Sequence, residues 1–144
     1  MNTRLLGIDH GDSRIGLAIS DELGSFAHPY RTLQSGARVI DEIRAIVERV
    51  QISGIIIGFP KNMDGTLGPA AAKVKLFGEQ LAQVLPTIKI IFWDERLTTR
   101  EAQRALHAAG KNAKQSKKMI DQVAPQILLQ NYMDSLQWTR LSNV

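Results

Sequence analysis

The sequence predicts an α/β fold with a five-stranded mixed sheet in the order 3-2-1-4-5 and helices on both faces. Three strand-like segments come first with no helix between them, which favours antiparallel neighbours. Helical and strand-like segments then alternate, a pattern typical of parallel strands joined by crossover helices. Right-handed crossovers place the fourth strand beside the first and the fifth strand beyond it.

The first two strands should form a β-hairpin over residues 5–20. An apolar run ends in Asp9, the chain turns through residues 11–13, and a second run alternates large and small residues. Alternation separates two faces, one with Ile15, Leu17 and Ile19 and the other with Gly16, Ala18 and Ser20. The small face should let another group approach the backbone beside Asp9. An acid at the end of a buried strand indicates a partner or a cation, although Asp9 could instead cap the turn.

The next three elements follow from local patterns. Residues 25–33 should form the third strand, and Pro29 places it at an edge because proline cannot donate to a β-ladder. Apolar residues between 39 and 50 recur at helical spacing, which predicts an amphipathic helix. The β-branched run at residues 55–57 is typical of a strand covered on both faces.

The remaining elements complete the alternation. A helix should begin at Gly68-Pro69, because proline suits the first helical position, and should end at Pro86. Residues 88–93 should form the fifth strand, and a capping-box spacing at residues 98–101 predicts a helix that runs to about residue 109. A last helix should face inward with Ile120, Val123, Ala124, Ile127 and Leu128.

Length and composition restrict the class of protein. A chain of 144 residues with 44% hydrophobic and 22% charged residues is typical of one soluble domain, which we expect to span residues 1–144. The absence of cysteine excludes disulfides and thiolate metal sites. No signal-peptide pattern and no apolar run long enough to span a bilayer are found, so we expect a cytoplasmic protein without membrane contact.

Two carboxylates should meet at one edge of this sheet. Asp9 and Glu95 follow parallel strands at their carboxyl ends, where functional groups gather in such sheets. Gly58, on the strand between them, has no side chain to fill the gap. Converging carboxylates without His or Cys ligands suit hard cations such as Mg²⁺ or Mn²⁺.

Positive charge is concentrated in one segment. The whole chain carries a net charge of +4, whereas residues 96–118 hold seven basic residues against one acid, a net charge of +6. The basic residues are Arg96, Arg100, Arg104, Lys111, Lys114, Lys117 and Lys118. This segment could be a solvated surface or could contact a phosphate backbone.

Four stretches of the chain, in order and at similar spacing, resemble the motifs of the YqgF family. The first runs from Gly7 to Asp21, and the second combines Gly58-Phe59-Pro60 with residues 62–65. The third is Asp94-Glu95-Arg96-Leu97-Thr98-Thr99, and the fourth is Lys118-Met119-Ile120-Asp121 followed by Ala124, Ile127 and Leu128. Members of that family are proposed to act as Holliday-junction resolvases and as nucleases of the small-subunit ribosomal RNA precursor.

The resemblance implies an RNase H-like fold and a metal-dependent endonuclease that acts on structured nucleic acid. Carried over by position, Asp9, Glu95 and Asp121 would be both the catalytic acids and the ligands of Mg²⁺ or Mn²⁺. Asp121 rests on the family alone, since its pattern also fits a polar residue at the edge of a helix face. The residues expected to contact nucleic acid are Arg14, Asn62, Arg96, Arg100, Lys111, Lys114, Lys117 and Lys118. Asn62 and Thr66 could line the substrate groove, or residues 64–65 could simply form a turn.

The expected function is 5′-end maturation of pre-16S rRNA, which would make the ribosome or its precursors partners of a monomer or weak homodimer. The alternatives are resolution of branched DNA of the Holliday-junction type and catalytically silent RNA binding in ribosome assembly. An actin-like ATPase or sugar kinase also opens with an Asp-x-Gly hairpin, but it needs a second similar domain for which this chain is too short.

Two residues depart from the family pattern. His10 stands where the family usually has an apolar or aromatic residue, and we expect a packed neutral imidazole rather than a pH-sensitive neighbour of the metals. Pro125 follows Asp121 by four residues, so within a helix it would remove one hydrogen-bond donor and produce a kink. Trp93 is expected to belong to the core.

Overall fold

The computed structural model describes residues 4–60, 64–94 and 125–136. The elements in chain order are β1 (Leu5–His10), β2 (Arg14–Ser20), β3 (Ala27–Gln34), α1 (Val39–Val50), β4 (Gly54–Phe59), α2 (Pro69–Val84) and β5 (Lys89–Asp94), followed by a helix at residues 125–136. The helix predicted between residues 98 and 109 lies outside the described residues. No helix in the part that is described is long and apolar enough to cross a membrane.

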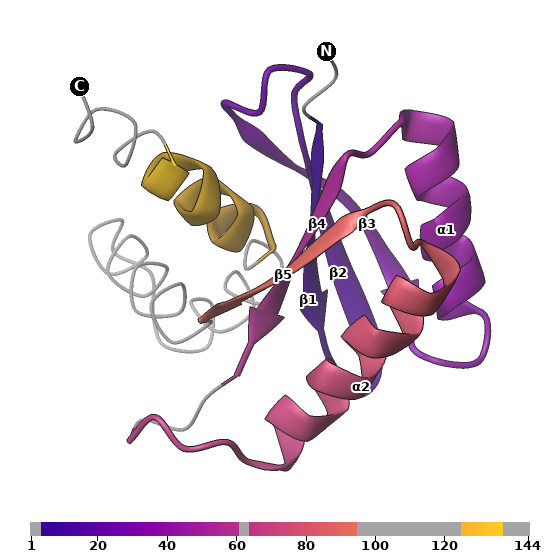
Figure 1. Ribbon diagram of the computed structural model, residues 1–144, viewed down its shortest axis with the longest axis vertical. Coiled ribbons are helices and arrows are strands. Elements are labelled where there is room, and N and C mark those ends of the chain that lie inside the picture. The colour runs from indigo at the N-terminus through magenta and orange to yellow at the C-terminus, as the bar shows by residue number, and fades with distance from the viewer. Residues whose placement is uncertain (1–3, 61–63, 95–124, 137–144) are drawn as a thin grey trace, which may run out of the picture.

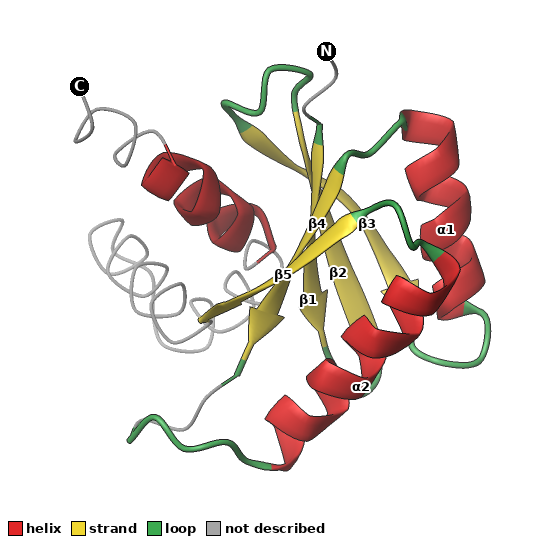
Figure 2. Ribbon diagram, in the orientation of Figure 1, coloured by secondary structure: helices red, strands yellow, loops and turns green. Residues whose placement is uncertain are grey.

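The five strands form one sheet in the order β3-β2-β1-β4-β5, as predicted (Figure 1). β1 is antiparallel to β2 and parallel to β4, β2 is antiparallel to β3, and β4 is parallel to β5. Figure 2 shows α1 and α2 on one side of the sheet and the helix at 125–136 on the other. The mixed sheet with helices on both faces is therefore confirmed.

β4 lies inside the sheet between β1 and β5, and its side chains enter both cores. Ile55 and Ile57 pack with α1 and α2, whereas Ile56 packs with the helix at 125–136, and all three are fully buried. The core toward α1 and α2 also takes Ile15 and Leu17 from β2, and the opposite core takes Ala18. The two faces predicted from alternation in the hairpin are thus confirmed.

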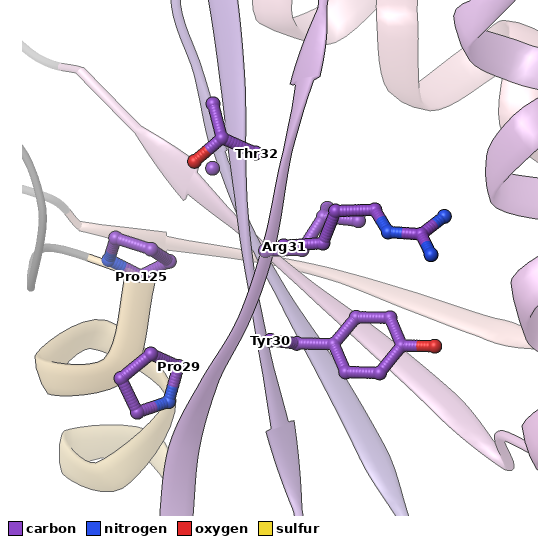
Figure 3. Close-up of a pocket in the computed structure, with 7 residues that line it drawn as sticks. Pro29, Tyr30, Arg31, Thr32 and Pro125 are labelled. Carbon is purple, nitrogen blue, oxygen red and sulfur yellow. The ribbon is translucent and has the colours of Figure 1, made fainter.

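β3 is an edge strand, as Pro29 predicted, but it carries a bulge that the sequence did not indicate. Leu17 of β2 pairs with Arg31, and the next residue, Ala18, pairs with Pro29, so Tyr30 has no partner on β2. Figure 3 shows the Tyr30 and Arg31 side chains on one side of β3 and Pro29 on the other. The Arg31 guanidinium lies 5.8 Å from the centre of the Tyr30 ring, which supports this arrangement.

The turn between β2 and β3 is held by the carboxylate of Asp21. Its Oδ1 accepts hydrogen bonds from the backbone amides of Ser25 at 2.7 Å and Phe26 at 3.3 Å. Gly24 takes φ = 70°, a left-handed conformation that glycine adopts without steric cost. These hydrogen bonds lower the pKa of Asp21 below its ordinary value, chiefly through the Ser25 amide.

The helix at 125–136 is attached to β3 by two glutamine side chains. The Gln130 amide accepts a hydrogen bond from Ala27 N at 2.8 Å and donates one to Ser25 O at 2.9 Å, and Gln126 donates to Ala27 O at 3.0 Å. The buried stripe of the helix differs from the prediction. Leu128 is buried as predicted, but Ile127 is only partly buried, and Leu129 and Met133 complete the buried stripe. The buried face is centred on Leu129 because its Cβ lies against Gly7 of β1. The other predicted inward residues, Ile120, Val123 and Ala124, lie outside the described residues.

Candidate active site

Asp9 lies at the carboxyl end of β1, where the sequence places it. It pairs with Gly16 across the hairpin, and its side chain is half-buried. Among residues 4–60, 64–94 and 125–136, no side chain or backbone amide donates a hydrogen bond to its carboxylate, and no cation forms an ion pair with it. A half-buried acid with free acceptor oxygens is suited to binding a cation or a substrate donor. This geometry argues against the alternative that Asp9 only caps the turn.

The residue beside Asp9 on the next strand has no side chain. The paired register of β1 and β4 ends at Ile8 and Ile57, which leaves Asp9 and Gly58 as the next residue of each strand. Gly58 in turn pairs with Trp93 of β5. Three adjacent strands, β1, β4 and β5, therefore carry Asp9, Gly58 and Trp93 side by side. β5 ends at Asp94, so Glu95 itself lies outside the described residues.

The small face of the hairpin receives the helix at 125–136. A Cβ at Gly16 would lie 3.1 Å from Cγ of Pro125 and 3.9 Å from Cβ of Asp9. A Cβ at Gly7 would lie 2.9 Å from Cβ of Leu129. The group that approaches the backbone beside Asp9 is thus this helix, and its first described residue, Pro125, packs over Gly16. Whether Pro125 lies inside a longer helix depends on residues outside the described ranges.

Pro125 also closes a small cavity next to the site. The cavity has a volume of about 210 Å³ and lies between Gly16, Pro29, Thr32 and Pro125 (Figure 3). Thr32 pairs with Gly16, which pairs with Asp9, so the three residues stand at one level on β3, β2 and β1. The face that carries Asp9 thus continues toward the edge strand.

Arg14 is the second predicted site residue that the structure describes. It is the first residue of β2, pairs with Gln34 and is exposed. Alternation along β2 places it on the same face as Gly16, which is the face of Asp9. The other predicted residues lie outside the described ranges: Asn62, Glu95, Arg96, Arg100, Lys111, Lys114, Lys117, Lys118 and Asp121.

The turn that follows Asp9 is fixed by contacts that sequence reasoning missed. Gly11 N donates to Arg14 O at 2.9 Å, and Ser35 donates to Ser13 O from its backbone and to Gly11 O from its hydroxyl, each at 3.1 Å. Lys73 of α2 contacts Asp12 at 3.0 Å. Ser35 and Lys73 come from distant parts of the chain and leave no local pattern in the sequence. The two Ser35 hydrogen bonds tie this turn to the loop after β3.

His10 points away from Asp9, to the face covered by α2. Its ring lies 4.7 Å from the ring of Phe77, measured between centroids. Burial lowers the pKa of His10 below its ordinary value of 6.5, although the charges of Asp12 and Asp9 oppose this shift. The expectation that His10 is packed away from Asp9 is confirmed, and the lowered pKa favours the neutral imidazole.

Contacts bear on two further expectations, while a place of Asn62 and Thr66 along the substrate groove stays a prediction. Thr66 donates to Oδ1 of Asp64 from its backbone at 2.9 Å and from its hydroxyl at 2.6 Å, and Gly65 takes φ = 88°. Residues 64–66 therefore form a turn. Trp93 is partly buried and packs edge-on against Tyr132 at 5.5 Å, so it belongs to the core.

The described residues alone do not assemble a complete metal site. Within 4–60, 64–94 and 125–136, no three His, Cys, Asp or Glu side chains lie close enough to share an ion. Among the described residues, the carboxylates of Asp9 and Asp94 stand at the carboxyl ends of β1 and β5, whereas His10 faces the opposite side and the chain has no cysteine. An all-oxygen donor set fits Mg²⁺ or Mn²⁺.

The sequence model of the RuvX family, described as Holliday junction resolvase, matches residues 3–135. The chain belongs to this family. Relatives from Acetivibrio thermocellus and Thermoanaerobacter pseudethanolicus are each 44% identical over 135 residues, which cover 92% of this chain and 96% of the relative. Both carry the name "Putative pre-16S rRNA nuclease". The resemblance to the YqgF family is therefore confirmed.

Solved structures with the same arrangement of elements show the fold. RuvC of T. thermophilus, in complex with a Holliday junction substrate, aligns with a TM-score of 0.57 at 13% identity and covers 94% of this chain and 96% of its own. The fowlpox virus Holliday junction resolvase aligns with a TM-score of 0.55 at 13% identity and covers 92% and 99%. The fold of the chain is thus RNase H-like.

Proposed function

We propose that this chain is a metal-dependent endonuclease that hydrolyses phosphodiester bonds in structured nucleic acid, with the 5′ end of pre-16S rRNA as its substrate. One observation carries the proposal: the Asp9 carboxylate, half-buried at the carboxyl end of β1, has no donor among the described residues and lies beside Gly58, which has no side chain. The choice of substrate is supported by the name that the relatives at 44% identity carry.

We infer that Asp9, Glu95 and Asp121 together hold Mg²⁺ or Mn²⁺. Bound there, such ions would activate water and stabilise the leaving oxygen of a phosphodiester. Asp9 supplies a ligand that is fixed by the hairpin and by the anchored turn after it. Residues 1–144 would act as one nuclease domain, a monomer or weak homodimer in the cytoplasm that meets the ribosome or its precursors.

Nucleic acid would cross the Asp9 face of the sheet. Arg14 lies on that face with its guanidinium exposed, and no hydrogen bond or ion pair engages it among the residues that are described. We propose that it contacts a phosphate, together with the residues predicted outside the described ranges. These are Asn62, Arg96, Arg100, Lys111, Lys114, Lys117 and Lys118.

A second function is supported by the description of the matched family as a Holliday junction resolvase. The two substrates can be tested side by side with purified protein, on an RNA that contains the pre-16S 5′ leader and on a four-way DNA junction. We expect Mg²⁺- or Mn²⁺-dependent cleavage of the RNA, lost on chelation and in Asp9→Asn. Cleavage of the junction but not of the RNA would show that the substrate is branched DNA. Binding of RNA without cleavage by any metal-loaded sample would favour a silent assembly factor.

A further inference from the structure

A cavity of about 560 Å³ lies on the opposite side of the sheet from Asp9. It is formed by the end of β1, the loop after β3, the start of α1 and one face of α2. This volume is within the range of cavities that hold small ligands. The site described above does not use it, because alternation along β1 places Asp9 on the other face.

One stripe of α2 forms a wall of the cavity and changes character along its length. Lys73 stands at one end, Leu76 and Phe77 follow, and Gln80 and Gln83 come next. The spacing of three and four residues keeps these side chains on a single helix face. The wall therefore offers a cation, then an apolar surface, then two amides.

The cationic end of the cavity lies beside the turn that follows Asp9. Lys73 contacts Asp12 at 3.0 Å, and both side chains are exposed. A surface ion pair of this kind contributes little to stability, so a phosphate can replace the Asp12 carboxylate as the partner of Lys73. Ser35 and His10 line the same cavity and provide a hydroxyl and an imidazole.

The middle of the cavity is suited to a flat apolar group. The Phe77 ring is buried and packs at 4.7 Å on the His10 ring, and Leu76 is 56% exposed although it lies on the cavity wall. A ligand ring placed here would cover Leu76 and contact Phe77. Burial of that exposed apolar surface would favour binding.

The glutamine end of the cavity can form hydrogen bonds with the edge of a nucleobase. A glutamine amide offers one donor and one acceptor side by side, which matches the N6 and N7 edge of adenine. Lys73 and Gln80 are seven residues apart, which is about 10.5 Å along a helix axis. This separation is comparable to the distance between the phosphate and the base edge of a nucleoside monophosphate.

We propose that this cavity binds one mononucleotide unit, with the phosphate on Lys73, the base against Leu76 and Phe77, and the base edge at Gln80. The unit can come from two sources, a free nucleotide or an unpaired nucleotide of a longer strand. The proposal does not depend on cleavage at Asp9. Occupancy would take Lys73 from its ion pair with Asp12 in the turn beside Asp9.

The test is calorimetric titration of the full chain with AMP, adenosine and inorganic phosphate, in buffer with a chelator so that no nucleic acid is cleaved. AMP should bind saturably and more tightly than adenosine or phosphate. Lys73→Gln should lower the affinity for AMP about tenfold, which corresponds to a loss of about 1.4 kcal/mol of binding free energy, and should leave the affinity for adenosine unchanged. Leu76→Gln, at an exposed position, should weaken both AMP and adenosine. Lys75→Gln is the matched control, since Lys75 is exposed on the same helix but does not line the cavity.

A short single-stranded oligoadenylate, titrated in parallel, distinguishes the two sources. If AMP binds more tightly than the oligoadenylate, the ligand of the cavity is a free nucleotide. If the oligoadenylate binds more tightly and Lys73→Gln weakens its binding, the ligand is an unpaired nucleotide of a strand. Amide shifts in nuclear magnetic resonance spectra should gather at residues 35–40 and 73–84. The proposal is overturned if neither ligand binds at millimolar concentration, if Lys73→Gln and Lys75→Gln act equally, or if the shifts fall on the Asp9 face.

Discussion

Replacement of Gly7 by alanine tests whether the helix at 125–136 is seated on β1. The new Cβ would lie 2.9 Å from Cβ of Leu129 and 3.1 Å from the carbonyl oxygen of Pro125. Neither atom is the free end of a flexible side chain, so the helix itself has to move away from the sheet. Overpacking of this kind costs about 1–3 kcal/mol of folding free energy.

The loss is partly offset in the unfolded state. Alanine restricts the unfolded chain more than glycine and so stabilises the fold by about 0.4–1 kcal/mol where the backbone conformation suits it. The net loss for Gly7→Ala should therefore be roughly 0–2.6 kcal/mol. For a chain of this size each kcal/mol lowers the melting temperature by about 2–4 °C.

Urea denaturation followed by circular dichroism measures this difference. Gly54→Ala is a matched control in the neighbouring strand, because its Cβ would meet only the Cδ2 end of Leu5 at 3.1 Å and Lys89 O at 3.7 Å. That side chain can rotate away, so the control should lose less stability than Gly7→Ala. Equal stability of the two variants would refute the close packing of the helix on β1.

Three further predictions concern single side chains. Gln130→Ala should destabilise the fold by about 1–3 kcal/mol, because Ala27 N is left buried without an acceptor; Gln126→Ala, which frees only a carbonyl oxygen, should cost less in the same urea titration. Asp21→Asn should be less stable than the wild type above pH 3.8, because the pKa of Asp21 is lowered in the fold. The stability contributed by the carboxylate disappears as the pH falls through that lowered pKa, so the two proteins should become equally stable in acid. A difference in the free energy of unfolding that persists unchanged in acid would contradict this. Arg14→Gln should weaken RNA binding and reduce the salt slope by about 0.7–0.9 if Arg14 contacts one phosphate, and an unchanged slope would remove it from the interface.

The sheet and its order could be predicted because they depend on local patterns. The β-branched run at residues 55–57 indicates a strand covered on both faces, and the alternation of large and small residues from Ile15 to Ser20 separates the two faces of β2. Right-handed crossovers then leave one strand order. The position of Asp9 at a strand end followed from the same reasoning. These features need no knowledge of which distant residues meet.

The features that could not be predicted depend on distant contacts. Gly7 and Gly16 are small because Leu129 and Pro125 lie against them, and those residues are more than 100 positions away. The bulge at Tyr30 follows from the pairing of β2 with β3 and not from Pro29 alone. The anchors of the turn after Asp9, Ser35 and Lys73, likewise come from other elements. Glu95 and Asp121 remain predictions from the sequence.

The central claim is that Asp9 binds a divalent cation at the carboxyl end of β1, and paramagnetic Mn²⁺ tests it most directly. Added to the full chain, Mn²⁺ should broaden the backbone amide resonances of Asp9, Gly16 and Gly58, which surround the carboxylate. Asp9→Asn should abolish this broadening, whereas Asp41→Asn, at an exposed carboxylate of α1, should leave it unchanged. Equal broadening in wild type and Asp9→Asn would contradict the claim.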